Sequence, residues 1–504
     1  MAPSIAELIS PSLLLVVLIS AVVLRLSLRQ IFVHHGHREP PLAPRSLPII
    51  GHILGLARGS FEFYLTEGTS KQVSASIYTM RVVQQAHKMH KSLAFRPLEV
   101  KFAHAIFGTS PGAQAILELN VHGRHVESGF AAAAHVGIQD ALLPGTSLDE
   151  MGRAMLGDFV NRLASICPRT GLYSWLRNNM SAAATYATYG PSDPFKDKAI
   201  REAYWDFEKG MISILLGILP SVTARKPTAA REKVLRAFME YYKSGGLADA
   251  SALARNRYEA AIRHNMPLED IARLEIGSAL AVVVNITPAA FWALLLFYST
   301  PGLLQDVRSE LDACIAMGTE DGVRVRTIDV AAIKNGCPLL MSSYQEMLRF
   351  RAIGNSVREV MEDTLLDGHL LKKGAMLQMP TRVIHENDKL WGDTGFLPRR
   401  FLKESEPKPR DMWFRAWGGG KTLCPGRHFA TTMVVAVVAL FAARLDMKPI
   451  KGTWPLPTAA KSGMTAGIMQ PDYDVEVEIT SRPGYEDARW AIRLDESNER
   501  FFIE

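Results

Sequence analysis

A cysteine near the carboxyl end of the chain has the surroundings of a reactive thiolate. Cys424 lies in the stretch WGGGKTLCPGRHFA, residues 417–430, between a glycine run and a Pro-Gly pair. Gly418 and Gly420 can take positive backbone angles, which let another group approach the main chain closely. Pro425 favours the first turn of a helix, and an apolar helical pattern follows it. The unpaired N–H groups at such a helix start would stabilise a thiolate at Cys424.

Two kinds of chemistry use such a thiolate. A catalytic nucleophile requires a base, and His428 lies one helical turn further along the chain. An axial ligand to iron requires no base, because the thiolate itself donates electron density to the metal. The spacing of the residues leaves both alternatives open.

Helices are expected to position this site, because a 3.6-residue apolar periodicity dominates and strand-like runs are few. The segment 147–166 has an amphipathic stripe, and Ser147 and Glu150 have the spacing of a capping box at its start. No internal repeat and no clear linker divide residues 53 to 480.

A second segment, 269–301, is amphipathic in its first turns and almost entirely apolar afterwards. The polar Asn285 and Thr287 and the helix-breaking Pro288 lie at its centre. We interpret it as a core helix that lines a cavity, and a second membrane span is the alternative. Because proline removes one helical hydrogen bond, we expect a kink and a free carbonyl near Val284.

The composition fits a large globular protein. Of 504 residues, 48% are hydrophobic and 21% are charged, which predicts a packed core. The net charge of +6 comes from scattered basic residues. It argues against a nucleic-acid partner and suits an anionic membrane surface or an acidic protein. The four cysteines lie far apart without a CxxC pair, which argues against a disulfide framework and a zinc site.

The amino-terminal segment predicts membrane attachment. Residues 5–24, IAELISPSLLLVVLISAVVL, have about the ~20 residues that a membrane helix needs, and three arginines follow within the next residues. The positive-inside rule then places the bulk of the protein in the cytosol. A cleavable signal peptide is the alternative, but the segment has no basic start and no clear cleavage site. We expect a membrane anchor at 1–30, a proline-rich hinge at 31–52 and one catalytic domain at 53–504.

The stretch around the cysteine resembles the haem-binding loop of the cytochrome P450 family. Its pattern is Trp417-Gly418-x-Gly420-x-x-x-Cys424-x-Gly426, with tryptophan where phenylalanine is more usual. The resemblance implies that Cys424 is the axial iron ligand of haem b and that the other four residues form the loop around the cofactor. It also implies a mainly α fold, a large helical domain with small β-sheets, here with one N-terminal transmembrane helix.

Two further stretches agree with the family in order and spacing. Glu346 and Arg349 in EMLR lie three residues apart, on one helical face, and are similar to the Glu-x-x-Arg pair of the family. Arg400 in FLPRRF resembles the arginine that completes a structural triad with this pair. A surface ion pair would be the ordinary interpretation of an isolated Glu-x-x-Arg, and the cysteine loop is what changes it.

Haem propionates are anionic and need cationic partners. The resemblance implies that Arg358 in SVREV and His385 in RVIHEND bind them. Family members often carry arginine or histidine two residues before the cysteine; that residue is Thr422 here, so the alternatives are that Lys421 serves instead or that the contact is missing. The Trp-x-x-x-Arg helix of the family is absent near residue 120. A solvated basic surface is the alternative for each of these residues.

The centre of segment 269–301 departs from ordinary monooxygenases, which have an acidic residue followed by threonine to deliver protons to dioxygen. No carboxylate is available here, so Asn285, Thr287 and Pro288 are the expected catalytic residues. Their Asn-x-x-Pro-x-x-Phe-Trp pattern is similar to the branch of bile-acid-type sterol hydroxylases and prostacyclin synthase. The alternative is that Asn285 satisfies a local backbone group.

The resemblance implies a monooxygenase that oxidises a hydrophobic terpenoid, sterol-like or other secondary-metabolite substrate with dioxygen. NADPH would supply electrons through a separate flavin-containing reductase. The alternative is an isomerase that rearranges a lipid peroxide without reductase. A haem sensor without turnover has only the missing carboxylate in its favour. The expected location is the endoplasmic reticulum membrane, single-pass, with the catalytic domain in the cytosol. Four apolar segments are expected to line the substrate pocket: 101–108, 210–220, 351–357 and 462–469.

Overall fold

The computed structural model describes residues 38–40, 79–121, 129–217, 219–406, 409–463, 466–486 and 488–494. The predicted anchor at 1–30 and all of the hinge except 38–40 lie outside the described residues. The transmembrane helix and the boundaries of the three predicted segments therefore stay predictions.

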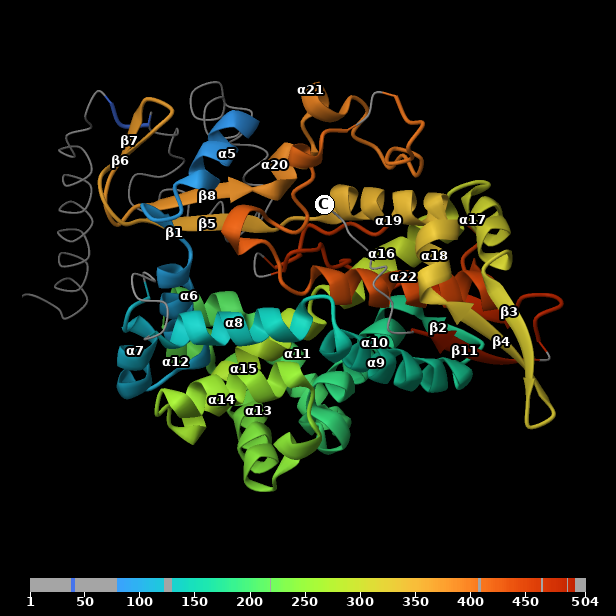
Figure 1. Ribbon diagram of the computed structural model, residues 1–504, viewed down its shortest axis with the longest axis horizontal. Helices are drawn as coiled ribbons and strands as arrows, with labels where there is room; N and C mark the ends of the chain where they lie inside the picture. Colours follow the sequence, from blue (N-terminus) through green and yellow to red (C-terminus); the bar gives the residue numbers. More distant parts are fainter. Residues whose placement is uncertain are drawn as a thin grey trace, which may run out of the picture.

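Helices make up most of the described chain (Figure 1). They are α5 (Met80–Lys88), α6 (Arg96–Phe102), α7 (Pro111–Glu118), α8 (Phe130–Leu142), α9 (Thr146–Ala164), α10 (Leu172–Tyr189), α11 (Lys198–Leu216), α12 (Pro220–Thr223), α13 (Arg225–Lys243), α14 (Ala252–Arg263), α15 (Leu268–Val283), α16 (Ile286–Ser299), α17 (Leu303–Asp312), α18 (Val330–Gly336), α19 (Pro338–Arg351), α20 (Thr381–His385), α21 (Asp388–Trp391) and α22 (Arg427–Arg444).

The strands form small sheets. One sheet has the order β1 (Leu93–Ala94), β5 (Asn355–Val360), β8 (Met376–Pro380), and a second has the order β2 (Arg169–Gly171), β10 (Glu476–Ser481), β9 (Leu445–Pro449). A third has the order β11 (Arg489–Arg493), β4 (Val323–Asp329), β3 (Ile315–Glu320), and β6 (Thr364–Leu366) pairs with β7 (His369–Leu371). In the first sheet β5 pairs antiparallel with both neighbours, which places Arg358 opposite Leu377.

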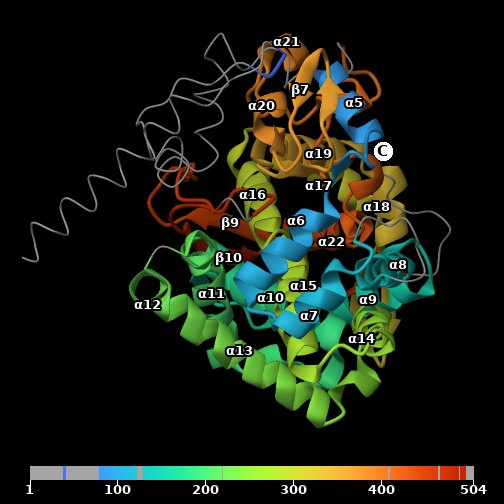
Figure 2. The ribbon, with the colours of Figure 1, turned by 90° about the vertical axis from the view of Figure 1, so that its left-hand side faces the viewer.

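The helices that carry Thr287, Glu346 and Arg349 lie between the two ends of the molecule, whereas Arg358 and His385 are on elements of one end. Figure 1 and Figure 2 place β5 to β8, with α5, α20 and α21, at one end and α13 and α14 at the other. Helices α16, α19 and α22 lie between them and pack on one another. Their side chains belong to a single large hydrophobic core.

Segment 269–301 is a core element with a break at the predicted place. It forms α15 and α16, which are interrupted at Val284 and Asn285 and thus just before Pro288. The most apolar 18-residue window of Leu268–Ser299 has a mean hydropathy of 2.1, enough to cross a membrane, but 83% of that window is buried inside the protein. This burial favours the core-helix interpretation over a second span.

The capping box predicted for segment 147–166 is wrong, although the helix itself is present. Helix α9 begins at Thr146, with Gly145 preceding it, and the Asp149 N–H donates to the Gly145 carbonyl at 3.1 Å. Ser147 is already inside the first turn. Its side chain therefore cannot occupy the non-helical position from which a cap accepts its hydrogen bond.

Candidate active site

The cysteine loop closes on itself before α22. The Cys424 N–H donates a 3.0 Å hydrogen bond to the Trp417 carbonyl. Gly418 and Gly420 have φ of 80° and 62°, in the left-handed region that favours glycine. A Cβ on Gly420 would also lie 3.0 Å from Nδ1 of His87. Backbone conformation requires both glycines, and close packing against His87 requires Gly420.

Opposing effects act on the Cys424 thiol. Burial raises its pKa, whereas hydrogen bonds from the backbone N–H groups of Gly426 and Arg427, together with the Arg427 charge, lower it. The start of α22 thus lowers the pKa of Cys424, as predicted, but desolvation raises this pKa by more. Because a coordinated metal cation deprotonates a thiol, iron ligation would overcome this cost of burial.

The hydrogen bonds to the Cys424 sulfur come from the main chain. Within the described part of the chain, Cys424 Sγ receives hydrogen bonds from the backbone N–H groups of Gly426 and Arg427. The candidate base, His428, is buried in α22. Hydrogen bonds from the main chain favour the metal ligand, because a thiolate ligand requires no base.

Glu346, Arg349 and Arg400 are brought together as a buried triad. Arg349 Nε and Nη2 donate to Glu346 Oε2 and Oε1 at 2.8 and 2.7 Å, and Arg400 Nε donates to Glu346 Oε2 at 3.0 Å. Arg349 also donates to the carbonyls of His385 and Gly395 at 2.9 and 2.7 Å. Glu346 and Arg349 are 0% exposed, so these additional bonds are what offset the desolvation of the charges.

His385 does not have the geometry predicted for it. Its Nδ1 is 2.9 Å from the Arg349 carbonyl, and its Nε2 accepts a 2.9 Å hydrogen bond from the Arg415 N–H. Burial and the charge of Arg349 lower the pKa of His385 to about 3, so the ring is neutral, with its proton on Nδ1. Both nitrogens are engaged with the main chain, which contradicts the prediction that His385 binds a propionate.

Two arginines and a histidine lie together beside the cysteine loop; Arg358 is buried, and Arg415 and His87 are half-buried. Arg358 Nη2 donates to Thr422 Oγ1 at 2.5 Å and lies 3.4 Å from Nδ1 of His87. Arg415 Nη2 is 2.5 Å from Nε2 of His87. Burial and the charge of Arg415 lower the pKa of Arg358 to about 10. The pKa of His87 falls to about 3 through burial and the charges of Arg415 and Arg358. We call Arg358, Arg415 and His87 the cation cluster.

The cation cluster fits an anionic ligand. No carboxylate of the described residues pairs with Arg358 or Arg415, whose side chains contact Thr422, His87 and a backbone carbonyl. Trp417 Nε1, in the same loop, is buried without an acceptor among the described residues. Buried charges and donors normally have partners, so haem propionates would supply what these side chains lack.

Lys421 does not belong to the cation cluster. Its side chain is exposed, whereas Arg358 is 4% exposed. The residue next to it, Thr422, reaches Arg358 in its place. The expectation that Lys421 replaces the missing basic residue before the cysteine is therefore not supported, because its ammonium group is solvated.

The three residues at the break in the long helix have different environments. Asn285 Oδ1 accepts from the N–H groups of Gly467 and Ile468 at 2.7 and 3.3 Å. The Thr287 hydroxyl is fully buried and donates to the Val283 carbonyl at 3.3 Å. Pro288 is buried in the first turn of α16. The side-chain oxygen of Asn285 thus accepts hydrogen bonds from the backbone, which agrees with the alternative that this residue satisfies backbone groups. Its amide nitrogen is the side-chain atom still available to another group.

The core helix α15 is not buried evenly. Ala281 is exposed although Val282 and Val283 are buried, and Gly277 and Asn285, four residues away on either side, are half-buried. Gly277 packs against Phe107, since a Cβ at this position would lie 2.5 Å from the Phe107 ring.

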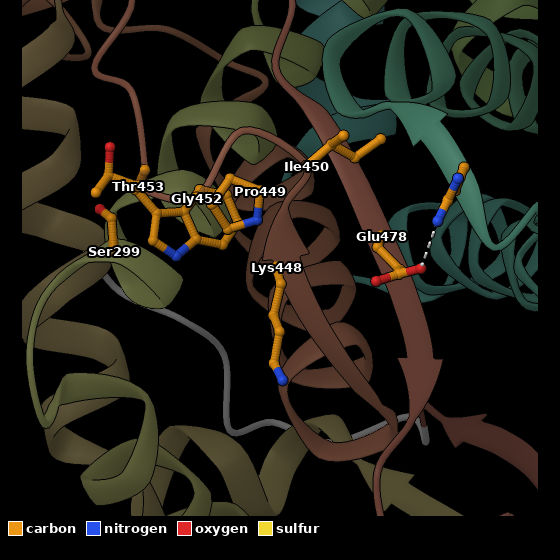
Figure 3. Close-up of a pocket in the computed structure, with 9 residues that line it drawn as sticks. Ser299, Lys448, Pro449, Ile450, Gly452, Thr453 and Glu478 are labelled. Carbon is orange, nitrogen blue, oxygen red and sulfur yellow. Dashed lines mark hydrogen bonds and ion pairs between the residues drawn. The ribbon is translucent and has the colours of Figure 1, made fainter.

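A cavity of about 720 Å³ lies beside the sheet β2-β10-β9 (Figure 3). It is lined by Arg169, Ser299, Lys448, Pro449, Ile450, Gly452, Thr453, Trp454 and Glu478. No residue predicted for the site lines it, so it is distinct from the Cys424 loop.

Known proteins resemble this chain over most of its length. A family model described as Cytochrome P450 matches residues 245–478. Cytochrome P450 monooxygenase nodJ of Hypoxylon pulicicidum is 32% identical over 497 residues, covering 92% of this chain and 94% of that protein. The 5-beta-cholestane-3-alpha,7-alpha-diol 12-alpha-hydroxylase of Sus scrofa is 23% identical over 504 residues, covering 93% and 98%. Prostacyclin synthase of Bos taurus is 29% identical over 258 residues, covering 46% and 51%.

A solved structure also resembles this chain in its fold. Retinoic acid bound cyanobacterial CYP120A1 matches with a TM-score of 0.68 at 17% identity, over 89% of this chain and 100% of that chain. At this identity the match establishes the fold alone, and it confirms the mainly helical architecture with small sheets. Taken with the extended identity to a fungal monooxygenase, it leads to one assignment. The chain belongs to the cytochrome P450 family and is one of its monooxygenases, which are oxidoreductases. Membership implies haem with a thiolate ligand, dioxygen, a small-molecule substrate and a redox partner.

Proposed function

We propose that Cys424 holds the iron of haem b and that the chain oxidises a hydrophobic terpenoid, sterol-like or other secondary-metabolite substrate. The cation cluster next to the Cys424 loop is the observation that carries this proposal, because its two arginines, one buried and one half-buried, have no carboxylate partner within the described chain. When bound, the haem supplies the redox chemistry that activates dioxygen. The residues of the protein bind the haem and the substrate, orient them and shield them from solvent.

The loop residues would hold the cofactor from one side. Trp417, Gly418, Gly420 and Gly426 shape the turn that presents the Cys424 sulfur, and the triad braces the segment that leads to it. The Arg349 bond to the His385 carbonyl and the His385 bond from the Arg415 N–H join the triad to this segment. Arg358 and Arg415 would bind the propionates by charge-assisted hydrogen bonds, with Trp417 Nε1 as a further donor.

On the opposite side, Thr287 would pass protons toward the reacting oxygen. Its hydroxyl is the protic side chain at the helix break, and Asn285, which carries no titratable proton, fixes the break to residues 467 and 468. Pro288 maintains the break because it cannot donate the next helical hydrogen bond. We assign proton transfer to Thr287 and a positioning role to Asn285 and Pro288.

We infer the location and the electron donor of the protein from its sequence. The apolar segment 5–24 supports a single-pass anchor in the endoplasmic reticulum membrane with residues 53–504 in the cytosol, where lipid-dissolved substrates are accessible. Electrons would come from NADPH through a separate flavoprotein reductase. The net charge of +6 suits docking of an acidic reductase surface.

An isomerase that rearranges a lipid peroxide is the second candidate, favoured by the absence of a carboxylate at Asn285. The prostacyclin synthase match covers only 46% of the chain, whereas the hydroxylase and monooxygenase matches cover more than 90%. We therefore favour the monooxygenase.

Product analysis separates the two candidates. Membranes containing the full chain are supplied with terpenoids, sterols and a lipid endoperoxide, with and without NADPH and reductase, under labelled dioxygen. The monooxygenase gives a product that contains one labelled oxygen atom and depends on NADPH. An unlabelled isomer that forms without NADPH would replace this proposal with the isomerase.

A further inference from the structure

Two of the four cysteines lie side by side although they are 23 positions apart in the sequence. Sγ of Cys314 is 3.6 Å from Sγ of Cys337, and both are free thiols. Cys314 lies between α17 and β3, and Cys337 directly precedes the first residue of α19. Between them the chain forms the β3-β4 hairpin and α18, which bring it back to Cys314 (Figure 1). The proposed chemistry gives this pair no role.

The packing around the pair keeps the two sulfur atoms in contact. Gly336 has no side chain, and a Cβ at this position would lie 2.7 Å from Cys314 Sγ. Glu310 of α17 accepts from the N–H groups of Leu339 and Leu340 at 2.8 and 3.1 Å. The start of α19 is thus held against α17 before any S–S bond forms, and reacting atoms that are already in contact need little further ordering.

The two thiols differ in exposure. Cys314 is half-buried, whereas Cys337 is 0% exposed. Burial raises the pKa of Cys337, and the neighbouring Cys314 and the charge of Glu310 raise it further. The thiolate is the form that reacts with an oxidant, and burial suppresses it at Cys337. A small polar oxidant therefore reacts first at Cys314.

We propose that Cys314 and Cys337 are a peroxide-sensitive thiol pair that forms an intramolecular disulfide. Hydrogen peroxide transfers one oxygen atom to the Cys314 sulfur, which gives a sulfenic acid and water. The Cys337 sulfur then attacks Cys314 Sγ, the S–O bond breaks, and the hydroxyl leaves as water with the proton of the Cys337 thiol. Two thiols are oxidised to one disulfide, and one peroxide is reduced to two molecules of water.

The proposed function supplies this oxidant, because dioxygen that takes up two electrons and two protons without oxidising a substrate leaves as hydrogen peroxide. The disulfide closes a loop that contains the β3-β4 hairpin and α18. It also ties the end of α17 to the start of α19, the helix that carries Glu346 and Arg349. A cross-link lowers the entropy of the unfolded chain, so the oxidised protein is the more stable form.

Peptide mapping of the full-length protein, as purified, tests the disulfide. Hydrogen peroxide is added directly, and the remaining thiols are then blocked. Trypsin cuts at Arg324, Arg326 and Lys334, which leaves the two cysteines on separate peptides, 309–324 and 335–349. After peroxide we expect the two peptides to be joined, with a mass two hydrogen atoms below their sum, and to separate when a reductant is added. The oxidised protein should also unfold about 3 °C higher than the reduced protein.

Matched glycine variants test the contact between the sulfur atoms. Gly336→Ala places a methyl group against the Cys314 sulfur and displaces it, so the joined peptides should form on the order of tenfold more slowly. Gly318→Ala, in β3 of the same hairpin, is the control, because its Cβ meets nothing within 4 Å. Its rate should match the wild type.

Cysteine variants test the order of the two steps. Cys337→Ser should leave a sulfenic acid at Cys314 that dimedone traps, whereas Cys314→Ser should give no joined peptides and little trapped sulfenic acid at the buried Cys337. Cys167→Ser should form the joined peptides at the wild-type rate, because Cys167 is exposed and outside the pair.

The inference is overturned when peroxide leaves the two peptides unjoined in the wild type. Equal rates for Gly336→Ala and Gly318→Ala would also contradict it, because the contact in the folded protein would then not control the reaction. The result is independent of the proposed function, since added peroxide reaches the pair with or without turnover. The reduced carbon monoxide spectrum of the same preparation reports separately on the haem.

Discussion

Arg358 Nη2 and Thr422 Oγ1 are 2.5 Å apart, and this hydrogen bond joins strand β5 to the turn that precedes Cys424. Thr422 occupies the position where the family resemblance led us to expect a basic residue, so the loop contributes a hydroxyl and the strand contributes the charge. Arg415 and His87 complete the cation cluster. The cation cluster therefore assembles from three separate parts of the chain.

Removing one arginine should weaken cofactor retention. Arg415→Leu deletes one of the two guanidinium groups proposed to bind the propionates, and a charge-assisted hydrogen bond contributes about 1.5 to 3 kcal/mol. We expect haem to transfer to apomyoglobin on the order of tenfold faster than from the wild type. Lys421→Leu is the control, since Lys421 is exposed, and its transfer rate should match the wild type. Equal rates for Arg415→Leu and the wild type would remove Arg415 from the proposed site.

The buried triad should govern stability. Glu346→Ala leaves Arg349 and Arg400 without their carboxylate, and breaking a buried ion pair costs about 3 to 5 kcal/mol. The expected result is a large fall in the midpoint of thermal unfolding. Glu202→Gln, which removes an exposed partner of Lys198 at 3.7 Å, should change the unfolding free energy by less than about 1 kcal/mol. A similar midpoint for the two variants would show that the triad contributes no more than a surface pair.

Asn285 and Thr287 should have separable effects on turnover. Asn285→Ala leaves the N–H groups of Gly467 and Ile468 without their acceptor, so we expect a raised KM and more peroxide released per NADPH consumed. Asn285→Asp keeps an acceptor oxygen and should restore the KM. Thr287→Val should lower kcat with little change in KM, and Thr287→Ser should recover much of it. The assignment fails if Asn285→Ala lowers kcat alone and Asn285→Asp does not restore it.

Acid should destabilise the folded protein through His385. Its pKa is lowered to about 3 in the folded protein from 6.5, first by burial and then by the charge of Arg349. Between these two values the unfolded chain binds a proton that the folded chain does not, so the free energy of unfolding falls as the pH falls through this window. The contribution of one such group approaches about 1.4 kcal/mol per pH unit.

Comparison of two histidine variants isolates this contribution. His385→Gln should flatten the dependence of unfolding free energy on pH, whatever its effect on stability at neutral pH. His90→Gln, whose ring contacts only the Lys88 carbonyl among the described residues, should leave the slope unchanged. An unchanged slope in His385→Gln would show that His385 is not the group whose pKa differs between the folded and the unfolded chain.

The family resemblance of short stretches predicted much of the site. The triad of Glu346, Arg349 and Arg400 could be predicted because EMLR and FLPRRF resemble segments of the family, whereas helical periodicity alone placed only Glu346 and Arg349 on one face. Pro288 located the break in the long helix, because proline removes one helical hydrogen bond. His87 could not be found this way, because it lies more than 300 residues before Cys424 and only the packing of α5 against the loop brings it there. Arg415 carried a weak signal, an arginine two residues before Trp417.

His385 shows the limit of assigning a role from composition. A histidine near an arginine in RVIHEND has the chemistry of an anion ligand, but its tautomer and its partners depend on which carbonyl and which N–H surround it. The main chain of Arg349 and Arg415 takes both ring nitrogens.

The central claim is that the Cys424 thiolate ligates a haem held in this fold. The most direct measurement is the absorption spectrum of the reduced carbon monoxide complex of the full chain, compared with that of Cys424→His. The account predicts a red-shifted Soret band in the wild type, and in Cys424→His the unshifted band that imidazole-ligated haem gives. The same unshifted band in both proteins, or the red-shifted band in both, would contradict it.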